Sequence, residues 1–151
     1  MAHTTPGPSL NRIAFQATVH CLTGCAIGEV LGLVIGTALG WDDLPTIVLA
    51  ISLAFLFGYG LTIYPLLRSG LPFRAALTAA FAADTISITV MEVVDNAIVL
   101  AVPGAMDAGL TSSLFWGSLV LALAIAFVVT LPVNHSLISR GLGHATIHGR
   151  H

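Results

Sequence analysis

Long apolar runs separated by short polar segments dominate the chain. The runs extend over roughly residues 14–40, 44–67, 73–102 and 110–138. Each is long enough to cross the ~30 Å hydrocarbon layer of a bilayer as a helix of about 20 residues. No ten-residue segment alternates apolar and polar residues, as the strands of a membrane barrel do. Because lipid offers no partner to backbone N–H and C=O groups, the pattern predicts four transmembrane helices.

The composition supports an all-α integral membrane protein in the lipid bilayer. Hydrophobic residues make up 56% of the 151 residues, charged residues make up 8%, and the mean hydropathy is +0.97. Soluble domains carry about 25% charged residues. We expect a flexible arm over residues 1–12, a four-helix transmembrane bundle over residues 13–140, and a histidine-containing tail over residues 141–151.

The charged residues of the loops predict the orientation. All basic residues are arginines, and they flank the same end of the predicted spans, whereas the loops at the other end carry only aspartates. The positive-inside rule therefore places both termini in the cytoplasm and the protein in the plasma (inner) membrane. The arginines are Arg12, Arg68, Arg74, Arg140 and Arg150, and the aspartates are Asp42, Asp43 and Asp107.

The two halves of the apolar region resemble each other weakly. At an offset of 63 residues, Cys21 aligns with Asp84 and Glu29 aligns with Glu92. One interpretation is a pair of repeated helical hairpins, an arrangement in which membrane carriers build sites near the midplane. The other interpretation is that apolar helices resemble each other by chance.

Glycine recurs at every fourth position of the first span. Such a small-xxx-small stripe lets a second helix approach to backbone contact. We interpret the stripe as a helix-packing surface, and assembly into a homo-oligomer is an alternative use of it. Its members are Gly24, Gly28, Gly32, Gly36 and Gly40.

The stretch HCLTGCAIGE, residues 20–29, places thiols and ionisable groups inside the first span. Cys21, Cys25 and Glu29 follow one face of the predicted helix, turn by turn. Two thiols at this spacing can face one ion, and thiolate and imidazole ligands favour Cu(I), or Zn(II) when a carboxylate joins them. A buried cysteine also serves simply as a small apolar residue. The residues that we predict to complete a metal site are His20, Asp84 and His135.

Four carboxylates lie within the predicted spans, and no arginine lies at comparable depth. A charge at the bilayer centre costs at least about 2.5–3.5 kcal/mol, so these groups must be protonated, hydrated or neutralised by a cation. We interpret three of these carboxylates, together with one methionine, as an ion pathway leading outward from the cysteines; protonated acids that hydrogen-bond between helices are the alternative. The pathway residues are Glu29, Met91, Glu92 and Asp95.

The functional hypotheses follow from these groups. Phosphate-binding loops, a nucleophile elbow, an HExxH helix and a basic nucleic-acid patch do not occur, so an enzyme is the least favoured class and no nucleic-acid partner is expected. The first hypothesis is binding of a soft transition-metal ion, copper before zinc, for transport or metal handling. The alternatives are a proton- or cation-coupled carrier or channel that uses the carboxylates, and a haem-binding electron carrier with His20 and His135 as axial ligands.

The string HCxxGCxxGE in the first span, the third span ending MEVVDN and the fourth ending LPVNH resemble one known group. This is an uncharacterised family of bacterial and archaeal four-helix membrane proteins, filed as a domain of unknown function. The similarity covers roughly residues 14–144. It implies a four-helix membrane fold and supplies no activity; some relatives are described alongside copper oxidases, which lends the copper hypothesis only faint support.

Overall fold

Four α-helices make up nearly all of the computed structural model, which describes residues 9–105 and 107–140 and contains no strand in this part of the chain. Each helix is long and apolar enough to cross a membrane, so the predicted all-α transmembrane fold is confirmed. The helix ends differ from the predicted spans by at most four residues, and the predicted polar tail lies outside the described residues. The helices are α1 (Leu10–Ala38), α2 (Asp43–Arg68), α3 (Phe73–Ala101) and α4 (Ser113–Ser139).

Local signals explain where the helices begin and end. The side chain of Ser9 accepts a hydrogen bond from the backbone N–H of Arg12 (3.3 Å), so α1 begins at Leu10, inside the segment predicted as a flexible arm. The prediction that Gly40 extends the packing stripe is wrong. Gly40 has φ +70° and no neighbour that an added Cβ would meet, and the N–H of Trp41 donates to the carbonyl of Gly36 (2.9 Å). Gly40 therefore terminates α1 in a left-handed conformation that favours glycine.

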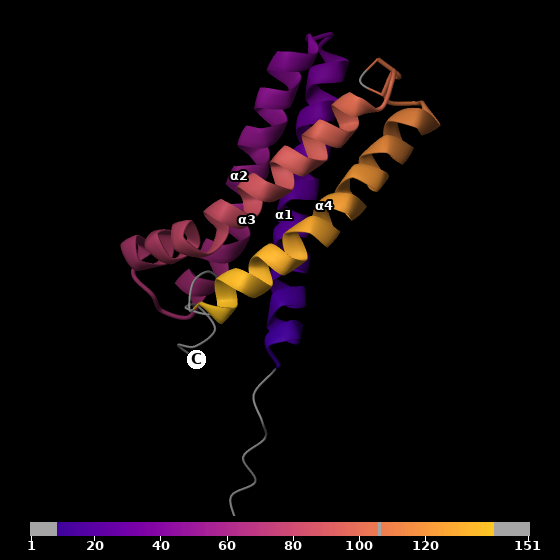
Figure 1. Ribbon diagram of the computed structural model, residues 1–151. Coiled ribbons are helices and arrows are strands. Elements are labelled where there is room, and N and C mark those ends of the chain that lie inside the picture. Colours follow the sequence, from indigo (N-terminus) through magenta and orange to yellow (C-terminus); the bar gives the residue numbers. More distant parts are fainter. Residues whose placement is uncertain (1–8, 106, 141–151) are drawn as a thin grey trace, which may run out of the picture.

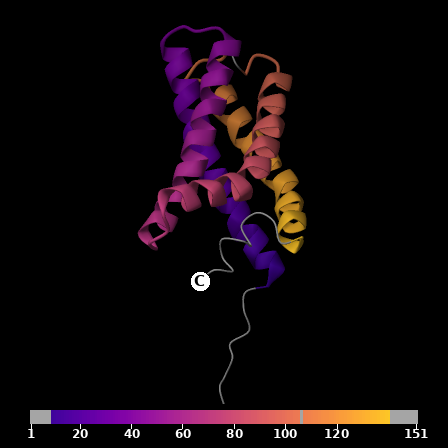
Figure 2. The same cartoon turned by 90° about the vertical axis from the view of Figure 1, so that its left-hand side faces the viewer.

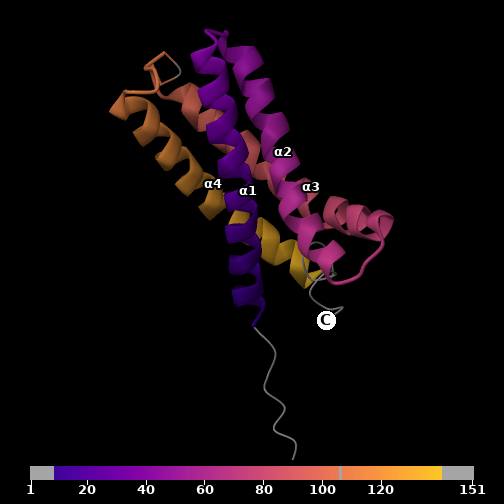
Figure 3. The same ribbon diagram turned by 180° about the vertical axis from the view of Figure 1, so that it is seen from behind.

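α1 and α3 form the centre of the bundle. Each of them contacts all the other helices, whereas α2 and α4 make no contact with each other within the described residues. α1 lies along α2, and α4 crosses α1 obliquely (Figures 1 and 3). The N-terminal part of α3 runs at a steep angle to the rest of that helix (Figure 2). α1 and α3 run in the same direction, and α1 begins at the same end of the bundle as α4 ends, the lower end in Figure 1.

The glycine stripe of α1 fits against small residues of α2. A Cβ added at Gly24 would lie 2.7 Å from the Cα of Gly58, and at Gly28 and Gly32 it would overlap the α2 backbone. The two helices therefore touch along their main chains, as small-xxx-small packing requires. The α2 residues in contact with the stripe are Thr46, Ala50, Ala54 and Gly58.

Apolar side chains close the bundle at both ends. An upper layer lies where α1 ends and α4 begins and contains Leu33, Val99, Phe115 and Leu119. A lower layer lies between the start of α1 and the end of α4 and contains Ala14, Ala17 and Ile138. Between these two layers the interior combines apolar side chains with buried polar ones, and the candidate site lies there.

Candidate functional site

A column of buried polar and sulfur-containing side chains lies between the upper and lower apolar layers. α1 and α3 supply most of it, because residues that recur every three or four positions on each helix face the other helix. α4 contributes from the remaining side. The buried members are Thr18, Cys21, Cys25 and Glu29 of α1, Asp84, Ser87, Met91, Glu92, Asp95 and Asn96 of α3, and Thr130 and Asn134 of α4.

Three sulfur atoms meet in the middle of this column. The Sγ atoms of Cys21 and Cys25 are 3.9 Å apart, and the thiol of Cys21 donates to the Sδ of Met91 at 4.0 Å. All three side chains are buried, and both cysteines are free thiols. Ala54 and Ala126 pack around them from α2 and α4. We call Cys21, Cys25 and Met91 the sulfur cluster.

The nitrogen and oxygen ligands predicted for the metal site do not form one shell with the cysteines. Within residues 9–105 and 107–140, no three His, Cys, Asp or Glu side chains are arranged to hold a metal ion. His20 shares a hydrogen bond of 2.9 Å between its Nε2 and the Oγ1 of Thr62 on α2. Asp84 is buried on α3, and His135 is half-buried near the end of α4.

Carboxyl groups gather one helical turn above the sulfur cluster. Glu29 of α1 interacts electrostatically with Glu92 and Asp95 of α3, and we call these residues the acid cluster. Glu29 is 0% exposed and Asp95 is 1% exposed. Both carboxyl oxygens of each of these two side chains are buried without a hydrogen-bond partner among the described residues. Glu92 is different, because its Oε2 accepts a hydrogen bond from Asn96 (3.2 Å).

The acid cluster adjoins the sulfur cluster through Glu92, which interacts with Cys25. Since α1 and α3 run in the same direction, the step from Cys25 to Glu29 and the step from Met91 to Asp95 both ascend by about 6 Å, four residues at 1.5 Å each. The predicted ion-pathway residues thus stand together in the structure. Met91, one of the predicted pathway residues, also contributes its sulfur atom to the sulfur cluster.

A hydrogen-bonded network ties three helices together below the sulfur cluster. The Nδ2 of Asn134 on α4 donates to the Oγ1 of Thr18 on α1 (2.9 Å), and its Oδ1 accepts a bond from the hydroxyl of Ser87 on α3. The hydroxyl of Thr18 donates to the carbonyl of Ala14 (2.7 Å). No role was predicted for these side chains from the sequence. The available signal was the single asparagine in the apolar fourth span, since such a group needs partners within the bundle.

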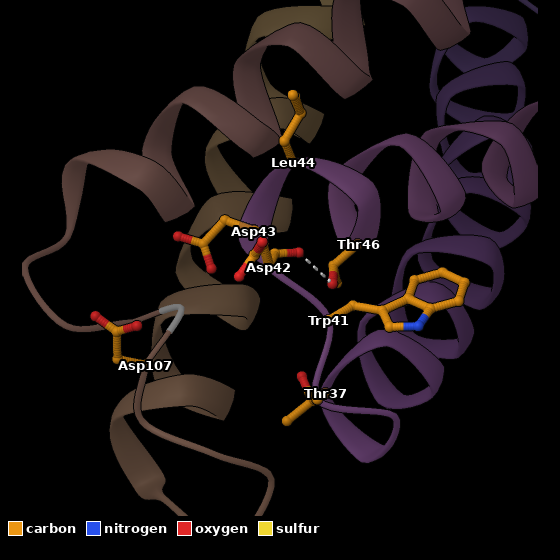
Figure 4. A pocket seen from close by; sticks show the side chains of 8 residues that line it. Thr37, Trp41, Asp42, Asp43, Leu44, Thr46 and Asp107 are labelled. Carbon is orange, nitrogen blue, oxygen red and sulfur yellow. Dashed lines mark hydrogen bonds between the residues drawn. The ribbon is translucent and has the colours of Figure 1, made fainter.

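A second polar feature lies outside the column, at the upper end of the bundle. A cavity of about 530 Å³ opens where α1 ends and α2 begins, and the loop between α3 and α4 borders it (Figure 4). Asp42, Asp43 and Asp107 line it, and all three are exposed. The hydroxyl of Thr46 donates to the main-chain oxygen of Asp42 (2.9 Å). The upper apolar layer separates this surface cavity from the acid cluster.

The comparisons with known proteins concern the family alone. The family model described as "Domain of unknown function (DUF4396)" matches residues 11–143, which include all four helices and the whole polar column. The chain belongs to this family. The predicted membership of an uncharacterised family is therefore confirmed, and DUF4396 brings no activity with it. No curated protein and no solved structure matches the chain.

Proposed function

We propose that the protein binds Cu(I) at the sulfur cluster and carries or stores the ion within the membrane. The observation that supports this function is the convergence of two thiols and one thioether from two helices on one buried position. Soft sulfur ligands select Cu(I) among the biological transition metals. Structural zinc sites take four ligands from Cys, His, Asp and Glu, so the thioether and the lack of a third such group among the described residues favour copper over zinc.

The separations of the sulfur atoms suit a three-coordinate ion. Sulfur ligands placed about 2.3 Å from a metal in a trigonal plane stand about 4.0 Å apart, which is 2.3 Å multiplied by √3. The Sγ of Cys21 lies 3.9 Å from the Sγ of Cys25 and 4.0 Å from the Sδ of Met91. An ion could therefore enter with small movements of side chains that the packing already orients, and preorganisation of this kind favours binding.

The charges around the column support a cation as the guest. No arginine of residues 9–105 and 107–140 lies in the middle of a helix, whereas Glu29, Glu92 and Asp95 lie within about one turn of the sulfur cluster. A buried negative charge without a basic partner is stabilised by a cation nearby. The acid cluster thus offers a second position to an ion that leaves the sulfur atoms, as expected for transport.

The orientation belongs to the same proposal. Arg12, Arg68, Arg74 and Arg140 all lie at the lower end, near the helix termini. The positive-inside rule then places the lower end in the cytoplasm of a cell with this protein in its plasma membrane. The path from the sulfur cluster to the acid cluster would lead outward.

Metal analysis of the purified protein tests the function. Protein in detergent is incubated with Cu(I) or Zn(II) under reducing conditions, desalted, and measured by elemental mass spectrometry. We expect about one copper per chain, since one trigonal site is present, and loss of this copper in the Cys21→Ser, Cys25→Ser double variant. Thr23→Ala is the matched control, because Thr23 is an exposed residue of the same helix whose hydroxyl donates to the carbonyl of Val19, one turn earlier in α1. Wild-type protein that stays copper-free, or that holds no more copper than the double variant, would refute the proposal.

The other two functions stay predictions. A proton- or cation-coupled carrier with inert cysteines would keep its flux in the double cysteine variant. A haem-binding electron carrier would show a Soret band after reconstitution with haem, and that band would disappear when His20 and His135 are replaced.

A further inference from the structure

We propose that the first part of α3, residues 73–83, lies along the lower surface of the bilayer and that Arg68 and Arg74 bind anionic phospholipids there. We call residues 73–83 the interfacial segment. The partner is the headgroup layer of the lipid in which the protein is embedded. This surface lies apart from the sulfur cluster, so the proposal stands independently of the copper site.

A bend sets the interfacial segment apart from the rest of α3. The segment projects sideways from the lower part of the bundle, whereas the remainder of α3 runs upward (Figures 1 and 2). Ala83 packs against Leu66 at the end of α2, whereas Ile88 already packs against the sulfur cluster. Between them, the hydroxyl of Thr85 donates to the main-chain oxygen four residues earlier, and the hydroxyl of Thr89 does the same one turn later. Such bonds often bend a helix.

The length of α3 allows the interfacial segment to stay out of the hydrocarbon layer. α3 has 29 residues. The part after the bend, residues 84–101, is about 27 Å long at 1.5 Å per residue. This part alone nearly matches the ~30 Å hydrocarbon layer. The interfacial segment is therefore not needed to cross the layer, and its steep angle to the crossing part keeps it near one surface.

The side chains that the interfacial segment turns away from α2 form an amphipathic surface. At about 100° per residue, Phe73, Leu77 and Phe81 form an apolar stripe along the helix. Arg74 and Thr78 lie beside this stripe, and both are exposed, as are the two phenylalanines. An apolar stripe next to basic and polar residues is typical of a helix that lies in the bilayer interface.

The charge of this surface is complementary to anionic phospholipids. Arg68 and Arg74 flank the turn between α2 and α3, and both are exposed. In the sequence, no acidic residue occurs between Asp43, at the other end of α2, and Asp84, which is buried. The Nη1 of Arg68 donates to the hydroxyl of Tyr64 (3.3 Å), an exposed aromatic residue of the kind that is enriched at headgroup level. Arginines near a leaflet attract anionic lipids.

Titration with lipid tests the binding. Protein in neutral detergent is titrated with phosphatidylglycerol or with phosphatidylcholine, and bound lipid is counted by native mass spectrometry. Phosphatidylcholine carries the same phosphate with a cation beside it, so we expect it to bind more weakly. The affinity for phosphatidylglycerol should fall about fivefold for each arginine removed in the Arg68→Gln, Arg74→Gln double variant.

The matched control is the Arg12→Gln, Arg140→Gln double variant. It removes two arginines from the same end of the bundle, one at the start of α1 and one after α4, and should keep the affinity of the wild type. Equal losses in the two double variants would overturn the proposed lipid site, and so would equal binding of the two lipids by the wild type.

The depth of spin labels tests the placement of the interfacial segment. Nitroxide labels are attached to cysteines introduced at Thr78 and Ala82, or at Ile27 and Leu31 of α1, four exposed positions. The native thiols are buried and react more slowly. Depth in the bilayer is measured from collisions with oxygen and with a water-soluble nickel complex. The α1 labels should differ in depth by about 6 Å, four residues at 1.5 Å each, whereas the labels on the interfacial segment should lie at similar depths. A difference at Thr78 and Ala82 as large as that in α1 overturns the placement.

Discussion

A methyl group at Gly28 is expected to destabilise the bundle, because this glycine touches the main chain of α2. A Cβ built on Gly28 overlaps the backbone of Ala54. α1 cannot retreat from this overlap without also opening the adjacent contacts of Gly24 and Gly32. The substitution therefore disturbs several turns of the interface at once.

The size of the effect follows from the overlap. At Gly24, where the fit is least tight, the added Cβ would lie 2.7 Å from the Cα of Gly58, and ordinary contact begins at 3.4 Å, a shortfall of 0.7 Å (3.4 − 2.7). A gap of about 0.5–1 Å forfeits a quarter to a half of the dispersion energy of each opened contact. Overpacking typically costs about 1–3 kcal/mol. We expect Gly24→Ala to lower the free energy of unfolding by about 1 kcal/mol and Gly28→Ala by about 2 kcal/mol.

Gly60→Ala supplies the matched control on α2. Gly60 lies inside the helix, and an added Cβ meets nothing within 4 Å. Alanine is favoured over glycine in a helix by up to about 1 kcal/mol, so this variant should be as stable as the wild type or more stable. The assay is reversible unfolding in mixed detergent micelles, followed by far-ultraviolet circular dichroism. If Gly28→Ala unfolds at the same detergent fraction as Gly60→Ala, the close packing of α1 on α2 is refuted.

Three further outcomes are expected. Met91→Leu keeps the volume of the side chain and removes one sulfur, so copper affinity should fall at least about tenfold with the fold intact; competition with a Cu(I) chelator measures this, and unchanged affinity would exclude the thioether as a ligand. Asn134→Leu removes the bonds to Thr18 and Ser87, and should cost about 1 kcal/mol in the same unfolding assay, as polar contacts between membrane helices do; a variant of wild-type stability would count against the network. A reporter that is active only in the cytoplasm should be active when it is fused to either terminus. Activity of a reporter that works only outside the cytoplasm would reverse the proposed orientation.

Hydropathy was sufficient to predict the fold, because a chain that crosses lipid must satisfy its backbone hydrogen bonds internally and few structures do so. The apolar runs predicted all four helices to within four residues at each end. The position at which α1 ends was missed, since Gly40 continues the four-residue period of the stripe. A four-residue spacing places residues on one helix face only as far as the residue at which the helix ends. The left-handed backbone of Gly40 is a property of the turn, and the stripe alone does not reveal it.

The candidate site was predictable on one helix and not between helices. The spacing of Cys21, Cys25 and Glu29 placed them on one interior face, and the structure buries all three. Their partners depend on the register between α1 and α3, which arises from packing of the whole bundle. For that reason Met91 was assigned to a pathway, although its sulfur meets the thiol of Cys21. His20 was assigned to the metal, although its ring bonds to Thr62.

The upper apolar layer bears on the passage of water and ions through the bundle. Leu33, Val99, Phe115 and Leu119 pack between the acid cluster and the cavity lined by Asp42 and Asp107. Water that enters from that mouth meets these apolar side chains before it reaches the acid cluster. A dry constriction of this kind opposes the passage of ions, so an ion could cross this end of the bundle only if the four side chains moved apart.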